Sequence, residues 1–164
     1  MEIRNRHMYQ GAALAQIAEH SQFTAINRIP SSRSAFLIND GIVIYIKYAT
    51  EPVQYDDYIF TFTRSQKSEI ELLSTQHPER VFIALICVED RQICCISYDE
   101  LAEWFEKRRA ALEDVEEETS TVLVKLPEGQ SFRLNMNMPG TRGQYLDEAQ
   151  IISRSDFPDI LFGH

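Results

Sequence analysis

Cysteine and histidine are scarce in this sequence, and neither residue falls in a recognisable disulfide or zinc-binding pattern. The 164 residues include only Cys87, Cys94 and Cys95, an odd number without the regular spacing of a disulfide framework. Cys94 and Cys95 are adjacent, whereas zinc-binding cysteine pairs are separated by two or more residues. The four histidines are scattered along the chain. These features predict free thiols and a cytoplasmic location, and they disfavour a structural zinc site.

Long apolar runs are also absent. No stretch approaches the ~18 apolar residues that a membrane-spanning helix needs, so we expect no membrane segment. Residues 1–7 lack the apolar core and the small-residue cleavage site of a signal peptide, which is therefore not expected. The chain contains no phosphate-binding loop, no Gly-x-Ser-x-Gly motif and no dinucleotide-binding fingerprint. No motif therefore supports a nucleotide-binding or serine-hydrolase function.

Positive charge is in deficit overall, but not in the first third of the chain. Sixteen Lys and Arg residues stand against 25 acidic residues, and the net charge is −9. Residues 1–48, in contrast, hold five basic residues against three acidic ones. The negative total disfavours general nucleic-acid binding, because attraction to phosphates supplies most non-specific affinity. Local potential matters more than the total for steering a ligand, so nucleic acid stays a possible partner of this first segment.

The most informative stretch is residues 35–48, in which two apolar runs flank Asn39-Asp40-Gly41. Both runs are short and rich in β-branched and aromatic residues, which is typical of strands. Asp-Gly readily adopts positive φ angles and closes tight hairpins. The pattern predicts a β-hairpin whose second strand carries one charged side chain, that of Lys47.

The remaining patterns predict an α/β fold with a central mixed sheet flanked by helices. Thr63 and Gln66 form a capping box that would start the second helix. The continuous apolar run from Val81 to Val88 is typical of a strand buried on both faces. We expect helices over 5–20, with Asn5 as N-cap, 64–75 and 98–112, and strands over 23–29, 35–38, 42–48, 58–62, 81–88, 92–96, 121–126 and 131–135.

The length predicts a single domain over residues 1–164. Within it we expect a core over 5–112, an acidic linker over 113–118 and an appended hairpin and tail over 119–164. The linker contains five acidic residues in six positions, and such a run is expected to be solvated. The last segment has too little apolar surface to fold alone, so we assign it to the same domain.

The order of elements around Lys47 resembles the core of the PD-(D/E)XK nucleases, a family of restriction enzymes, Holliday-junction resolvases and some homing endonucleases. In that family an Asp opens the first hairpin strand, Glu-x-Lys or Gln-x-Lys lies on the second strand, and a Glu often comes from the first helix. Tyr45-Ile46-Lys47 places Lys47 at the position of the motif Lys. The resemblance implies a restriction-endonuclease-like core, bound Mg²⁺ or Mn²⁺, and a Lys that positions or activates water.

The three carboxylate positions of that motif carry other residue types, which leaves two interpretations open. The positions correspond to Leu14 or Ala15, to Ser34 or Ala35, and to Tyr45. In one interpretation the site has migrated, so that Lys47 and Asp40 are catalytic and Asp40 and Asp57 are metal ligands. In the other, the protein is a non-catalytic or weakly active nuclease-like module for binding or regulation, without a cofactor.

Arg28, Arg33 and Tyr45 are the candidate binding residues, since arginines contact phosphates and aromatic rings stack on bases. The acidic composition makes a protein partner at least as well supported as nucleic acid, and residues 113–118 could dock on a basic partner surface. A third interpretation is a structural protein that forms homo-oligomers. Its partner surface would consist of exposed aromatic side chains: Tyr55, Tyr58, Phe60 and Phe62.

Overall fold

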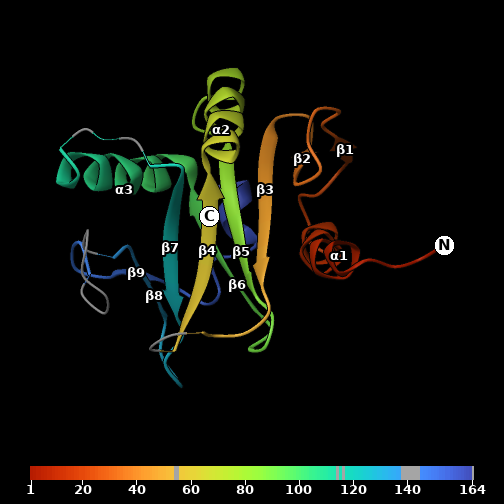
Figure 1. The fold of residues 1–164 in the computed structure, drawn as a ribbon. Coiled ribbons are helices and arrows are strands. Elements are labelled where there is room, and N and C mark those ends of the chain that lie inside the picture. Colours follow the sequence, from red (N-terminus) through yellow and green to blue (C-terminus); the bar gives the residue numbers. More distant parts are fainter. Residues whose placement is uncertain (54–55, 114, 116, 138–144, 164) are drawn as a thin grey trace.

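The computed structural model describes residues 1–53, 56–113, 115, 117–137 and 145–163. The predicted mixed α/β class is confirmed: helices pack on a mixed sheet, and a second sheet lies beside it (Figure 1). The helices are α1 (Asn5–Ala18), α2 (Arg64–Gln76), α3 (Tyr98–Ala111) and the short 3-10 helix η1 (Asp159–Phe162). The strands are β1 (Ile26–Arg28), β2 (Ala35–Ile38), β3 (Ile42–Ala49), β4 (Asp57–Thr63), β5 (Val81–Cys87), β6 (Gln92–Ser97), β7 (Thr119–Lys125), β8 (Phe132–Asn135) and β9 (Gln150–Ile152). None of the helices in this described part is long and apolar enough to cross a membrane.

The first sheet has the order β1-β2-β3-β5-β6, in which β3 and β5 are parallel and the other neighbours are antiparallel. The predicted hairpin is confirmed as β2 and β3, with Ala35 opposite Tyr45 and Ile38 opposite Ile42. The predicted strand with two buried faces is confirmed as β5, which lies between β3 and β6. This sheet carries the hairpin and Lys47, and α1 packs on one of its faces.

The hairpin turn differs from the prediction by one residue. Asn39 and Asp40, with φ angles of 52° and 60°, are the two residues in the left-handed region, rather than Asp40 and Gly41. The Asn39 carboxamide oxygen accepts hydrogen bonds from the backbone N–H groups of Thr24 and Ala25. Asn tolerates positive φ, and the Asn39 side chain also anchors the preceding loop. Asn39 therefore adopts the left-handed conformation that was expected for Gly41.

The single predicted sheet is in fact two sheets, since β4 belongs to a second one of order β4-β7-β8-β9. β4 pairs with β7 along its whole length, from Asp57 opposite Lys125 to Thr63 opposite Thr119. The predicted C-terminal hairpin is present as β7 and β8. Its first strand completes a sheet begun by β4, a pairing between distant segments that local sequence patterns do not reveal.

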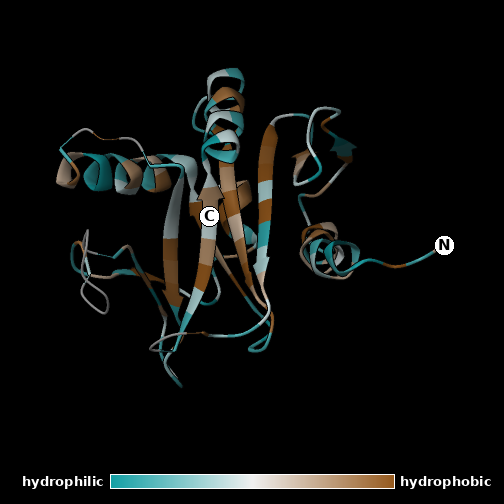
Figure 2. Cartoon of the chain, viewed as in Figure 1, coloured by the Kyte–Doolittle hydropathy of each residue, from teal (hydrophilic) through white to brown (hydrophobic). Residues whose placement is uncertain are grey.

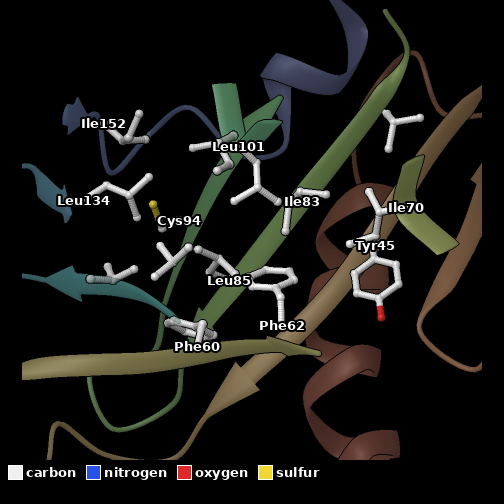
Figure 3. Packing of buried hydrophobic residues seen from close by; sticks show 14 of the residues in the cluster. Tyr45, Phe60, Phe62, Ile70, Ile83, Leu85, Cys94, Leu101, Leu134 and Ile152 are labelled. Atoms are coloured by element: carbon white, nitrogen blue, oxygen red, sulfur yellow. The ribbon is translucent and has the colours of Figure 1, made fainter. Parts of the chain in front are cut away.

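The two faces of the first sheet carry separate apolar clusters because side chains alternate along β3. Ile44 and Ile46 face α1 and the C-terminal segment, where Ala13 and Ile17 are buried. Tyr45 and the other odd-numbered side chains face the second sheet and α2 (Figure 3). β3 is hydrophobic along its first half and becomes polar toward its end (Figure 2).

The expected aromatic partner surface on β4 is wrong for the three residues that the structure describes. Tyr58, Phe60 and Phe62 are no more than 1% exposed and pack between the two sheets. They occupy every second position, so all three point to the same buried face of the strand. Tyr55, the fourth residue of that expectation, lies outside the described residues.

The helix ends follow local side-chain chemistry. The predicted capping box at α2 is confirmed: the Thr63 hydroxyl accepts from the Gln66 N–H, and the Gln66 carboxamide oxygen accepts from the Thr63 N–H. At α1 the N-cap is Arg4 rather than the expected Asn5.

The acidic segment is partly neutralised, because Glu117 forms a two-pronged ion pair with Arg108 of α3. Residues 114 and 116 of that segment lie outside the described part.

Candidate functional site

A cavity of about 310 Å³ lies where β3 continues past the start of β2. β2 begins at Ala35, and just before it the Ile46 N–H donates a hydrogen bond of 2.8 Å to the Ser34 carbonyl oxygen. The end of β3 therefore has no β2 neighbour, and α1 lies beside it (Figure 1). The cavity is lined by Arg6, Gln10, Arg33, Ser34, Ile46, Lys47 and Tyr48.

α1 supplies Arg6 and Gln10 because its sheet-facing side changes from apolar to polar toward its N-terminus. Arg6, Gln10, Ala13 and Ile17 are spaced so that they follow one side of the helix. Ala13 and Ile17 are fully buried against the sheet, and Gln10 is 7% exposed. The buried Gln10 amide donates a hydrogen bond of 3.0 Å to the Arg33 carbonyl oxygen. This bond fixes the segment that carries Arg33 to the helix.

A second cavity, of about 440 Å³, adjoins the first, since both include Arg6 and Arg33 in their walls. It is lined by Arg6, Arg28, Pro30, Ser31, Ser32, Arg33 and Phe36. The Ser32 hydroxyl accepts from the N–H groups of Ser34 and Ala35, both at 3.1 Å, which holds the loop in shape. We call the two cavities together the basic hollow, defined by Arg6, Arg28, Arg33 and Lys47.

The four cationic side chains of the basic hollow form no ion pair with a carboxylate among the described residues. None of its four cationic groups lies within 4.0 Å of a carboxylate in the part of the chain that the structure describes. Lys47 instead contacts a neutral side chain, with its Nζ 3.2 Å from Oε1 of Gln66. Burial lowers the pKa of Lys47, because its charged form is less well solvated there. An anion entering the hollow would meet uncompensated charge.

Tyr45 supports the hollow from inside the core and is not exposed to a ligand. Its ring is 1% exposed and packs beside Ile70 of α2, and its oxygen points away from the labelled apolar side chains (Figure 3). The hydroxyl interacts with the side chains of Ser34 and Glu69. Burial and the charge of Glu69 raise the pKa of Tyr45 to about 12. Tyr45 therefore joins β3 to α2 as a neutral residue, and its predicted role in base stacking does not fit this position.

The structure does not bring the two candidate aspartates to Lys47. Asp40 lies in the turn before β3 and accepts a hydrogen bond of 2.9 Å from Asn27. The five residue steps from Ile42 to Lys47 alone span about 17 Å along the strand. Asp57 starts β4, whereas Lys47 lies over the Phe62 ring near the end of that strand, again about 17 Å along it. Neither carboxylate is close enough to hold a metal ion beside Lys47.

The residues around Lys47 do not fit the divalent metal that the nuclease resemblance implies. Mg²⁺ and Mn²⁺ prefer carboxylate ligands, whereas Gln10, Ser34 and Tyr45 supply an amide, a hydroxyl and a phenol. Among the residues that are described, no group of three or more His, Cys, Asp or Glu side chains could hold a metal ion. The chemistry of the hollow suits an anionic ligand rather than a metal.

Sequence reasoning identified part of this site. Arg28, Arg33 and Lys47 were candidates and all three line the hollow. Gln10 was missed, although its spacing of three and seven residues from Ala13 and Ile17 marks it as a polar residue on a buried helix side.

A scan against protein-family models finds no match, and searches of curated proteins and of solved structures find no similar protein. The function is therefore inferred from the chemistry of the basic hollow.

Proposed function

We propose that this protein is a non-catalytic nuclease-like module that binds the phosphate backbone of nucleic acid in the basic hollow. The observation that carries the proposal is the group of four cationic side chains, Arg6, Arg28, Arg33 and Lys47, around two adjoining cavities without a carboxylate partner. Arginine presents a planar fork of N–H donors that matches the oxygens of a phosphate. Three of the four cations are arginines, so the hollow favours phosphate over a simple monovalent anion.

The net negative charge of the chain is compatible with this proposal because the charges are unevenly placed. The basic hollow belongs to residues 1–48, which carry a net charge of +2, whereas the rest of the chain carries −11. Phosphates would be attracted to this segment and repelled by the acidic remainder of the chain. Binding would then depend strongly on salt, since each phosphate contact in a single strand lowers the slope of log K against log[salt] by about 0.7.

The resemblance to PD-(D/E)XK nucleases adds support of a second kind. Four residues lie near the same end of β3. They are Gln10 of the first helix, Ser34 just before the first hairpin strand, and Tyr45 and Lys47 on the second strand. The family motif would have carboxylates on these elements, although the first-helix position expected from the sequence is Leu14 or Ala15 rather than Gln10; the side chains at these carboxylate positions are all neutral. Neutral side chains at these positions offer no carboxylate ligand to a metal and add no charge that would repel phosphate.

A binding assay with matched arginine variants tests the proposal. We expect a fluorescently labelled oligonucleotide to bind the wild type, and the double variant Arg6→Gln/Arg33→Gln to bind at least about tenfold more weakly, because two charge-assisted contacts are lost. Arg109→Gln is the control, since Arg109 is exposed on α3 and pairs with Glu106 outside the hollow. Equal affinity of the double variant and the control would refute the proposed site.

A cleavage assay separates binding from catalysis. We expect no product from single-stranded or duplex DNA with Mg²⁺ or Mn²⁺, because no carboxylate pair surrounds Lys47. Metal-dependent cleavage by the wild type that disappears in Lys47→Ala would contradict the non-catalytic proposal and favour an active nuclease.

A further inference from the structure

Tyr48 stands out beside the basic hollow because it is an exposed aromatic residue on a helix-covered face of the sheet. Its side chain is 37% exposed, whereas Ile42, Ile44 and Ile46 on the same face are at most 5% exposed. It is the only aromatic residue among the large apolar side chains that are exposed in the described part of the chain. Tyr48 also lines the cavity that contains Arg6, Arg33 and Lys47.

A second ring holds Tyr48 in place. The ring of Tyr9, from the first half of α1, lies with its centroid 4.7 Å from that of Tyr48 at an interplanar angle of 53°. Aromatic pairs at this separation attract each other beyond simple burial. The contact limits the freedom of the Tyr48 ring before any ligand arrives, so little conformational entropy remains to be lost when a flat ligand packs on it.

An aromatic ring next to phosphate-binding cations is the combination that recognises unpaired nucleotides. The cations attract the backbone, and the ring stacks on a base without regard to its sequence. In a duplex both faces of each base are already stacked, and exposing one of them requires that the base leave the helix. The cavity beside Tyr48 therefore favours a strand whose bases are free.

We propose that the ligand of the basic hollow is single-stranded nucleic acid and that one of its bases stacks on Tyr48. This inference rests on the proposed function and adds the substrate class and the base-binding residue. DNA and RNA share the phosphates and bases that it invokes, so both are expected to bind as single strands. Duplex DNA, which presents only its backbone, is expected to bind more weakly.

The experiment compares oligonucleotides that differ only in their bases. A labelled single strand, the same strand with abasic sites, and the corresponding duplex are titrated with wild type, Tyr48→Leu and Tyr48→Trp, and an RNA strand is tested in parallel. For wild type we expect the abasic strand and the duplex to bind roughly tenfold more weakly than the intact strand, as one lost stacking contact implies. Tyr48→Leu should bind the intact and abasic strands equally, while Tyr48→Trp should restore the preference for the intact strand.

A base analogue whose fluorescence falls on stacking provides a second measurement. Its emission should be quenched by wild type and by Tyr48→Trp, but not by Tyr48→Leu, whose thermal unfolding is compared with wild type to confirm that it folds. Two results would overturn the inference while leaving the proposed function intact: equal affinity of wild type for intact and abasic strands, or tighter binding of the duplex. If no oligonucleotide binds, the inference and the proposed function both fail.

Discussion

The ammonium nitrogen of Lys47 lies 4.8 Å from the centroid of the Phe62 ring, which is itself fully buried between the two sheets. The ring and the Gln66 carboxamide oxygen stabilise the cation locally, but they do not replace water completely, and burial lowers the pKa of Lys47. The charge of Lys47 is thus kept at a cost in folding stability. A ligand phosphate would offset that cost, which makes Lys47 better suited to binding than to holding the fold together.

The stability of the protein should therefore depend on pH through Lys47. A folded-state pKa below the unfolded-state value of ~10.4 means that protonated Lys47 destabilises the fold below its folded-state pKa. This destabilisation is lost as the pH rises from the folded-state pKa toward the unfolded-state value. As the pH rises from about 7 to about 10, we expect the free energy of unfolding of wild type to increase relative to that of Lys47→Met. Urea denaturation at both pH values measures this difference, and a constant difference would contradict it.

Gln10→Ala should weaken both the fold and the hollow. The substitution removes the 3.0 Å hydrogen bond to the Arg33 carbonyl oxygen, a loss worth about 1–2 kcal/mol in a partly buried site. Arg33 would then be held less firmly, so oligonucleotide affinity should fall as well. Gln16→Ala is the matched control, since Gln16 is exposed on the same helix. Denaturant unfolding and binding titration should separate the two variants, and identical behaviour would show that Gln10 has no positioning role.

Much of the fold could be predicted from the sequence because its signals are local. The hairpin with Lys47, the apolar strand 81–88 and the capping box at Thr63 each depend on neighbouring residues, and each is present. The pairing of β4 with β7 was not predicted, because it joins segments far apart in the chain and leaves no periodic pattern. The same limit explains the error on the β4 aromatics: alternation shows that they share a face, but not that the face is buried.

The candidate site was predictable only where one residue stands out from its surroundings. Lys47 is the single charge in an apolar strand, and Arg28 and Arg33 flank a polar loop, so these were recognised. The sequence does not show that Arg6 and Tyr48 belong to the same site, because they meet only through the packing of α1 beside the end of β3. A protein partner, homo-oligomer formation and the cytoplasmic location stay predictions, since the arrangement of the described residues does not test them.

Asn39 should be one of the most sensitive polar positions in the hairpin. Its side chain accepts from the Thr24 N–H at 2.7 Å and donates to the Gln22 carbonyl oxygen at 2.7 Å, while its backbone has a φ angle of 52°. Asn39→Ala removes these bonds and places a Cβ-bearing residue without compensation in the left-handed region, so we expect a loss of about 2–3 kcal/mol. Asn39→Gly removes the same bonds but relieves the backbone strain. It should therefore be less destabilised than Asn39→Ala in thermal unfolding, and the reverse order would show that the backbone conformation is unimportant.

Asp57 should oppose stability at neutral pH, in contrast to the usual surface carboxylate. It is 3% exposed; Oδ2 accepts from the Tyr145 hydroxyl at 3.2 Å, while Oδ1 is buried without a hydrogen-bond partner. Burial raises the pKa of Asp57 despite the attraction of Lys125. A raised folded-state pKa means that stability is lost as the pH rises from the unfolded-state value of ~3.9 through the folded-state pKa.

Asp57→Asn should remove this pH dependence, because the amide does not ionise. As the pH rises from about 4 to about 7, the free energy of unfolding of Asp57→Asn should therefore increase relative to that of wild type. Glu128→Gln, at an exposed carboxylate in the turn between β7 and β8, is the control and should keep the wild-type pH dependence. Denaturant unfolding at a series of pH values provides the comparison. If Asp57→Asn instead lost stability relative to wild type over that range, the carboxylate would be a stabilising partner of Lys125 and Tyr145 rather than a buried charge that the fold tolerates.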